Sequence, residues 1–142
     1  MATYETMARV LGLPGNVAIH TPFELISTIE NGLPVAALDH VSRLLSPNDA
    51  QFKFRLVPKA TYERRKVAHR LSADEGTRLA RVAGVWGLAL DVWKSEAAAR
   101  DFMFRPHAML DDRPPIDLVI QNEIGAELVR EVLAGLKYGS AA

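Results

Sequence analysis

The sequence contains no cysteine, which excludes disulfide bonds, cysteine-based zinc sites and thiol catalysis. It also has no run approaching the ~18 consecutive apolar residues that a membrane-spanning helix needs. The first residues, Met1 to Glu5, lack the basic segment and long apolar stretch of a signal peptide. We therefore expect a cytoplasmic protein without a membrane partner.

A net charge is missing too, because Lys plus Arg and Asp plus Glu both number 17 in a chain of 142 residues. A neutral total does not favour a nucleic-acid partner, although a local basic patch can still provide one. Apolar residues make up 49% of the chain, which is enough to bury a core. The length suits one domain, or two very small helical lobes that share a core.

The combinations of residues that usually carry catalysis are also missing. The four histidines share no metal-ligand spacing, and the adjacent acidic pairs 74–75 and 111–112 are explained by a helix start and a turn. There is no glycine-rich phosphate loop, no nucleophile elbow and no His-Glu-x-x-His motif. We expect no enzyme activity, no metal and no cofactor.

The chain instead shows a series of helical patterns, each bounded by capping residues, prolines or glycines. No segment shows a clear strand pattern, so the expected fold is all-α. Residues 1–20 are expected to form an arm with a single helical turn. The predicted helices then begin near Thr21, Pro34, Asn48, Pro58, Ser72, Ser95, Ile116 and Asn122.

The helix that begins at Ser72 is predicted to be the longest, because Ser72 and Glu75 form a capping box and apolar residues continue to about Trp93. It is apolar around most of its circumference, so it should be central and buried. Gly84 and Gly87 in its interior predict a close crossing by another helix. The last helix is expected to turn six apolar side chains inward: Ile124, Leu128, Val129, Val132, Leu133 and Leu136.

The most informative local feature is a basic stretch from Lys53 to Arg70, with seven basic side chains and one acidic, Glu63. Arg and Lys on the helix after Pro58 could hold DNA phosphates while Thr61 or Tyr62 approaches bases or sugars. The equally weighted alternative is a solvated helix face beside an acidic neighbour. The candidate DNA contacts are Lys59, Thr61, Tyr62, Arg64, Arg65 and Lys66.

The order of elements here is that of a helix-turn-helix: a short helix over residues 48–54, a tight connection, then the basic helix. The connection at residues 55–57 has no glycine, where such motifs often place one. The apolar stripes of the later helices are more typical of a core than of a ligand site. They leave enough apolar surface to favour a homodimer.

The ordered set of short motifs over residues 71–139 resembles the Xre/MbcA/ParS-type antitoxins. The motifs are Leu71-Ser72-x-x-Glu75-x-x-Arg78-Leu79, Ala89, Val92-Trp93, Ala97-Ala98, Pro106-x-x-x-Leu110, Pro115-Ile116-Asp117-Leu118, Gly125-Ala126-x-x-Val129 and Leu133-x-x-Leu136-x-Tyr138-Gly139. Upstream, residues 32–34 and residues 61–65 resemble parts of the family's Xre-like helix-turn-helix. The chain departs from the family at residues 102–105, because family members often have Trp-Leu ahead of the proline that matches Pro106.

The resemblance implies an antitoxin of a type II toxin–antitoxin system that silences a RES-domain toxin, an enzyme that consumes NAD. It implies toxin contacts by the last helix and its end, at Lys137, Tyr138, Gly139 and Ser140. It also implies a homodimer that represses its own operon by binding promoter DNA. The expected domains are an arm (1–20), the helix-turn-helix region (21–70) and a toxin-binding and dimerisation region (71–142). The alternative is a stand-alone helix-turn-helix regulator without a toxin.

Overall fold

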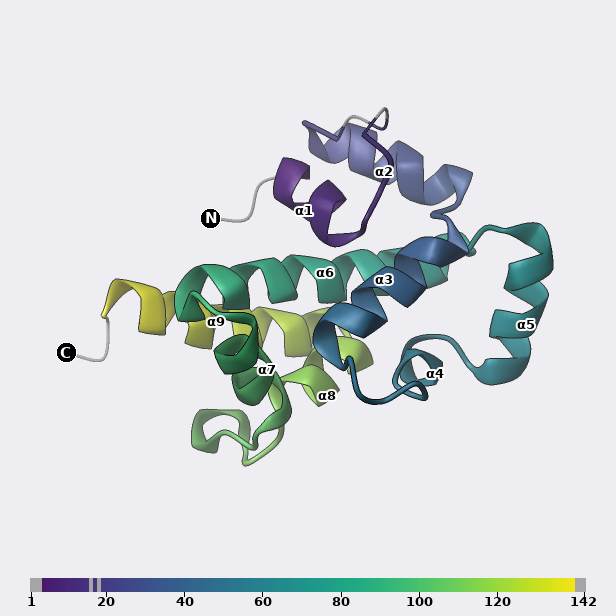
Figure 1. Ribbon diagram of the computed structural model, residues 1–142. Coiled ribbons are helices and arrows are strands. Elements are labelled where there is room, and N and C mark those ends of the chain that lie inside the picture. Colours follow the sequence, from purple (N-terminus) through teal and green to yellow (C-terminus); the bar gives the residue numbers. More distant parts are fainter. Residues whose placement is uncertain (1–3, 16, 18, 140–142) are drawn as a thin grey trace.

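The computed structural model describes residues 4–15, 17 and 19–139. In these ranges the chain forms nine α-helices, one short 3-10 helix and no strand, so the all-α prediction is confirmed. Figure 1 shows the remaining helices arranged around α6. The elements are α1 (Tyr4–Val10), α2 (Pro22–Asn31), α3 (Val35–Leu45), α4 (Lys53–Leu56), α5 (Lys59–Ala68), α6 (Ala73–Trp93), α7 (Glu96–Phe104), η1 (Ala108–Leu110), α8 (Pro115–Gln121) and α9 (Glu123–Tyr138).

Helix α6 is the central element, as its sequence predicts. The capping box is present, because Glu75 N–H donates to Ser72 Oγ at 3.2 Å and Ser72 N–H donates to Glu75 Oε1 at 2.8 Å. Most residues in the middle of the helix are buried, and Val82, Val85 and Trp86 are fully so. Its C-terminal end is more open than expected, since Trp93 is 39% exposed.

The close crossing predicted near Gly84 is confirmed, and the crossing helix is α1. A Cβ at Gly84 would stand 3.0 Å from Met7 Cε of α1. Helix α1 is longer than the single turn expected, and its last residue, Val10, is buried in the core together with Leu11, which follows it. Figure 1 shows α1 and α2 on one side of α6, with α7, α8 and α9 on the other.

The predicted short helix before the basic helix is displaced. It was expected over 48–54, but α4 is Lys53–Leu56, because turns occupy the residues before it and the Asp49 carboxylate accepts Gln51 N–H at 2.9 Å. The connection to α5 is therefore Val57-Pro58, both with extended backbone. No glycine is needed, because neither residue has a positive φ.

Helix α9 begins at the predicted Asn122 cap, whose side chain accepts Gly125 N–H at 2.8 Å. Val129, Val132 and Leu133 are buried as predicted. The inward assignment of three others is wrong: Ile124 is 75%, Leu128 44% and Leu136 46% exposed. The packed neighbours α6 and α8 cover only one side of this 16-residue helix.

Arginine side chains join segments that are distant in the sequence. Arg78 donates to the Leu56 carbonyl at 2.7 Å, and Arg100 donates to the Leu44 carbonyl at 2.7 Å. Arg81 donates to the last carbonyls of α8 at 2.8 and 2.9 Å. Each carbonyl lies at or near a helix end, where backbone acceptors lack intrahelical partners. Arg81 thus joins α6 to α8, and Arg100 joins α7 to α3, by polar contacts that add to the apolar contacts of the core.

Within the described residues no helix is both long and apolar enough to cross a bilayer.

Candidate functional surfaces

Helix α5 stands at the edge of the molecule, next to the N-terminal end of α6 (Figure 1). Tyr62 is its one buried residue. The Tyr62 hydroxyl donates to Asp39 at 2.8 Å and accepts from Lys53 Nζ at 3.1 Å. Burial alone would lower the pKa of Lys53, but its hydrogen bonds to Tyr62 and Asp39 raise it. These contacts hold α5 against α3 and α4.

Arg65 forms the second anchor of α5. Its guanidinium donates to Glu75 at 2.8 and 3.3 Å, and the Glu75 side chain is only 11% exposed. Burial alone would raise the pKa of Glu75, but the hydrogen bonds from Arg65 and Ser72 lower it. Two predicted DNA contacts, Tyr62 and Arg65, therefore have structural partners within the protein.

The remaining basic candidates of α5 project into solvent. Lys59, Arg64 and Lys66 are exposed, and Thr61 is half-buried. Arg64 Nη2 donates to Thr61 Oγ1 at 3.4 Å, and Lys66 Nζ lies 3.6 Å from Glu63 Oε2. Such exposed contacts contribute about 0–1 kcal/mol each, so these side chains are available to a polyanion.

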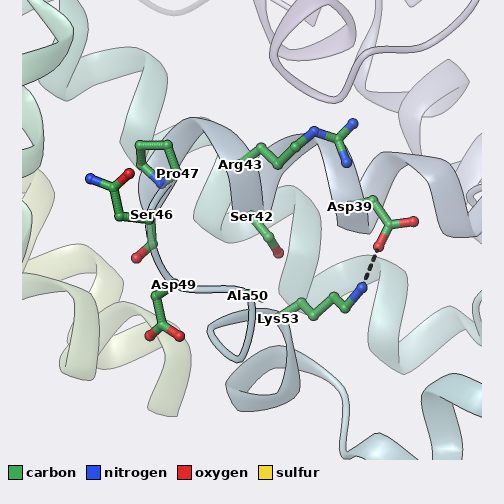
Figure 2. Close-up of a pocket in the computed structure, with 9 residues that line it drawn as sticks. Asp39, Ser42, Arg43, Ser46, Pro47, Asp49, Ala50 and Lys53 are labelled. Atoms are coloured by element: carbon green, nitrogen blue, oxygen red, sulfur yellow. Dashed lines mark hydrogen bonds and ion pairs between the residues drawn. The ribbon is translucent and has the colours of Figure 1, made fainter.

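A polar hollow of about 350 Å³ lies beside this region, between the C-terminal end of α3 and the segment that leads into α4 (Figure 2). Ser42 Oγ points into it from α3 and has no hydrogen-bond partner among the described residues. The Asp39–Lys53 ion pair, at 3.3 Å, lies at one side. The hollow is lined by equal numbers of acidic and basic side chains, with Asp49 and Arg43 as the others. It therefore has no net preference for an anion.

The far end of α6 carries the second candidate surface, at the C-terminal end of α9. The Lys137 ammonium forms an ion pair with Asp91 of α6. Its hydrogen bond lowers the pKa of Asp91 to about 2, and the same contact raises the pKa of Lys137. Tyr138 is 74% exposed, and Gly139 ends the helix with a φ of 64°. Ser140 lies outside the described residues.

Of the predicted toxin contacts, Lys137 is paired with Asp91 of α6, whereas Tyr138 is presented to solvent. Sequence reasoning missed the apolar side chains beside this end. Leu136 and Trp93 line a small hollow of about 220 Å³ with Phe102 and Pro106. Their exposure could not be read from the sequence, because the helical pattern resembles that of core residues.

The histidines have local roles where the structure defines them. His107 Nδ1 accepts the Met109 N–H at 3.2 Å and so caps η1. His69 ends α5 in the left-handed conformation. In the described part of the chain, no three His, Asp or Glu side chains are placed to hold a metal ion.

Two family models match consecutive parts of the chain. Residues 24–84, which include α5, match the antitoxin Xre-like helix-turn-helix domain. Residues 88–139, which include the C-terminal end of α9, match the antitoxin Xre/MbcA/ParS C-terminal toxin-binding domain. A comparison with curated proteins finds no significant match. Because the two matches follow one another in the order of this family and cover most of the chain, the protein belongs to the Xre/MbcA/ParS-type antitoxins.

Proposed function

We propose that this antitoxin neutralises a RES-domain, NAD-consuming toxin by covering the entrance of the toxin's active site with the C-terminal end of α9. The observation that supports this most directly is the exposed Tyr138 on an anchored helix end, inside the segment that matches a toxin-binding domain. An anchored end loses little conformational freedom on binding, which favours affinity. Covering the entrance of the toxin's active site needs no reactive group, so in this proposal the antitoxin acts by binding and not as an enzyme.

Co-expression with the toxin in the cytoplasm tests this function. Wild-type antitoxin should restore growth and cellular NAD, and Tyr138→Ala should protect less. Phe23→Ala is a matched control, because Phe23 is 76% exposed on α2 and lies outside the proposed surface. Killing that wild-type antitoxin does not relieve would reject neutralisation. Full protection by Tyr138→Ala would reject the role of the helix end.

We further propose that α5 binds promoter DNA of the antitoxin's own operon. Lys59, Arg64 and Lys66 supply the positive charge. Because binding releases counterions from the phosphates, affinity should fall steeply with salt. Replacing Lys59 by Ala should reduce the slope of log K against log salt by about 0.9 for each protomer bound. Lys94→Ala, which removes an exposed cation elsewhere, should leave it unchanged. An unaltered slope for Lys59→Ala would remove Lys59 from the interface.

A homodimer is part of this proposal, because helix-turn-helix proteins usually bind two half-sites about one DNA turn apart. Ile124 and Leu128 form an exposed apolar strip on α9 that a second copy would cover. Light scattering should give twice the mass of the chain, and Ile124→Ser should reduce it towards the monomer. A monomeric wild-type protein would reject the dimer. If promoter binding persists while co-expression gives no protection, the stand-alone regulator is the correct function.

A further inference from the structure

The two anchors of α5 define an inner side of the helix. Tyr62 contacts Asp39 and Lys53, and Arg65 contacts Glu75. Successive residues of an α-helix are 100° apart, so positions 60, 63, 64 and 67 lie on the side opposite to 62 and 65. All four outer residues are exposed, and Val67 reaches 83% exposure. Ala60, Glu63, Arg64 and Val67 are hereafter the outer face of α5.

The inner contacts are costly to break. Glu75 accepts two hydrogen bonds from Arg65 and also caps α6 through Ser72, so releasing Arg65 would leave a largely buried carboxylate with fewer partners. Removing one member of this partly buried pair should therefore be more destabilising than removing one member of a fully exposed pair. The outer contacts are weak by comparison, since the Lys66–Glu63 pair is long and both side chains are more than half exposed. The outer face can therefore rearrange on a ligand while the inner side stays in place.

We propose that the outer face of α5 reads the bases of the operator, and that Glu63 on this face selects cytosine. The inference rests on the proposed DNA-binding function. From position 60 to position 67 the helix rises about 10 Å, which matches about three base steps of 3.4 Å. In the major groove a carboxylate accepts a hydrogen bond from the N4 amino group of cytosine, and Arg64 matches the two acceptors of guanine. Val67 offers an apolar contact for a thymine methyl group.

Glu63 is the decisive residue, because an acidic side chain facing DNA is otherwise unfavourable. Positions 53–70 contain seven basic residues, and Glu63 is the single acidic residue there. Opposite guanine or thymine the carboxylate would meet acceptor oxygens, so it rejects those bases as well as favouring cytosine. Lys59 lies one helical turn before Glu63, and Lys66 Nζ lies 3.6 Å from its carboxylate. These two cations flank Glu63 and reduce its repulsion by the phosphates.

Selection of duplexes from a randomised pool by the full-length protein tests the inference. Wild-type protein should enrich cytosine at one position of each half-site, by at least about five-fold over the other bases. Glu63→Gln should lose that preference and shift it towards adenine, which pairs with a glutamine amide. Its affinity for unrelated DNA should be equal or higher, because a negative charge is removed. Glu30→Gln makes the same charge change on the exposed part of α2 and should leave the selected sequence unchanged.

An inner-side variant separates reading from anchoring. Tyr62→Phe should weaken binding without changing the selected bases. A cytosine preference that survives in Glu63→Gln, or the absence of any such preference in the wild type, overturns the inference while DNA binding stands. Wild-type protein that enriches no duplex at all overturns the DNA-binding function, and the inference with it. Circular dichroism of each variant shows whether its helices are intact.

Discussion

The two candidate surfaces lie at opposite ends of α6 and are held there differently. Helix α5 buries one residue, Tyr62, whose ring packs against Phe54 and whose hydroxyl contacts Asp39 and Lys53. Helix α9 buries five residues, including Val129 and Leu133, and its C-terminal end is also fixed by the ion pair of Lys137. A charged surface suits a ligand that is itself a polyanion, whereas a partner protein is usually bound through aromatic and apolar side chains surrounded by a polar rim. The exposed side chains, and not the anchoring ones, thus match the proposed ligand at each end.

The largest expected effect removes the apolar anchor of α9. Leu133 is 1% exposed, so Leu133→Ala should lower the free energy of unfolding by about 2–5 kcal/mol, because the cavity is not refilled. Leu136→Ala on the same helix is the control. Leu136 is 46% exposed, so its truncation should cost about 1 kcal/mol or less. Urea denaturation measures both. Equal losses for the two variants would mean that α9 is not held by its buried face.

A smaller effect is expected at the polar anchor of α5. Tyr62→Phe removes the hydroxyl that links Asp39 to Lys53, which should cost about 1 kcal/mol. The loss should be local, because few apolar contacts hold α5. Hydrogen exchange should accelerate in the amides of α5 and much less in those of α6. Uniform acceleration over the whole chain would contradict a separately anchored α5.

The smallest expected effect is the response of the C-terminal end of α9 to acidic pH. The hydrogen bond from Lys137 lowers the pKa of Asp91 from its ordinary value of 3.8 to about 2. A lowered folded-state pKa gives stability that is present above pH 3.8 and lost as the pH falls towards 2. Lys137→Met should raise the pKa of Asp91 towards its ordinary value, and NMR titration of the carboxyl carbon measures it. Lys59→Met, at the other end, should leave it unchanged. A pKa still near 2 in Lys137→Met would assign the shift to another group.

The sequence predicted those features whose cause is local. The caps at Thr21, Ser72, Ser95 and Asn122 all accept the expected backbone N–H, because capping depends on residues three positions apart. The proline before α5 and the glycine after α9 likewise mark real boundaries. The fold class and the central position of α6 followed from these signals and from apolar patterning.

Features that depend on distant neighbours could not be predicted. Leu128 and Leu136 fit an inward pattern, but the pattern does not say which sides of α9 are covered. Arg65 fits a DNA-facing helix equally well until Glu75 is seen beside it. The carbonyl partner of Arg100 is 56 residues away, at Leu44. Only the packing of the helices supplies this information.

The family matches divide the chain within α6, at residues 85–87. Val85 and Trp86 there are fully enclosed by other helices. A cut between the matched segments would therefore expose the most tightly packed part of the core, and neither fragment would keep a complete hydrophobic interior. Exchange of whole functional halves between such proteins should accordingly fail at this seam. Successful chimeras should instead keep α6 from a single parent together with the side chains that surround it.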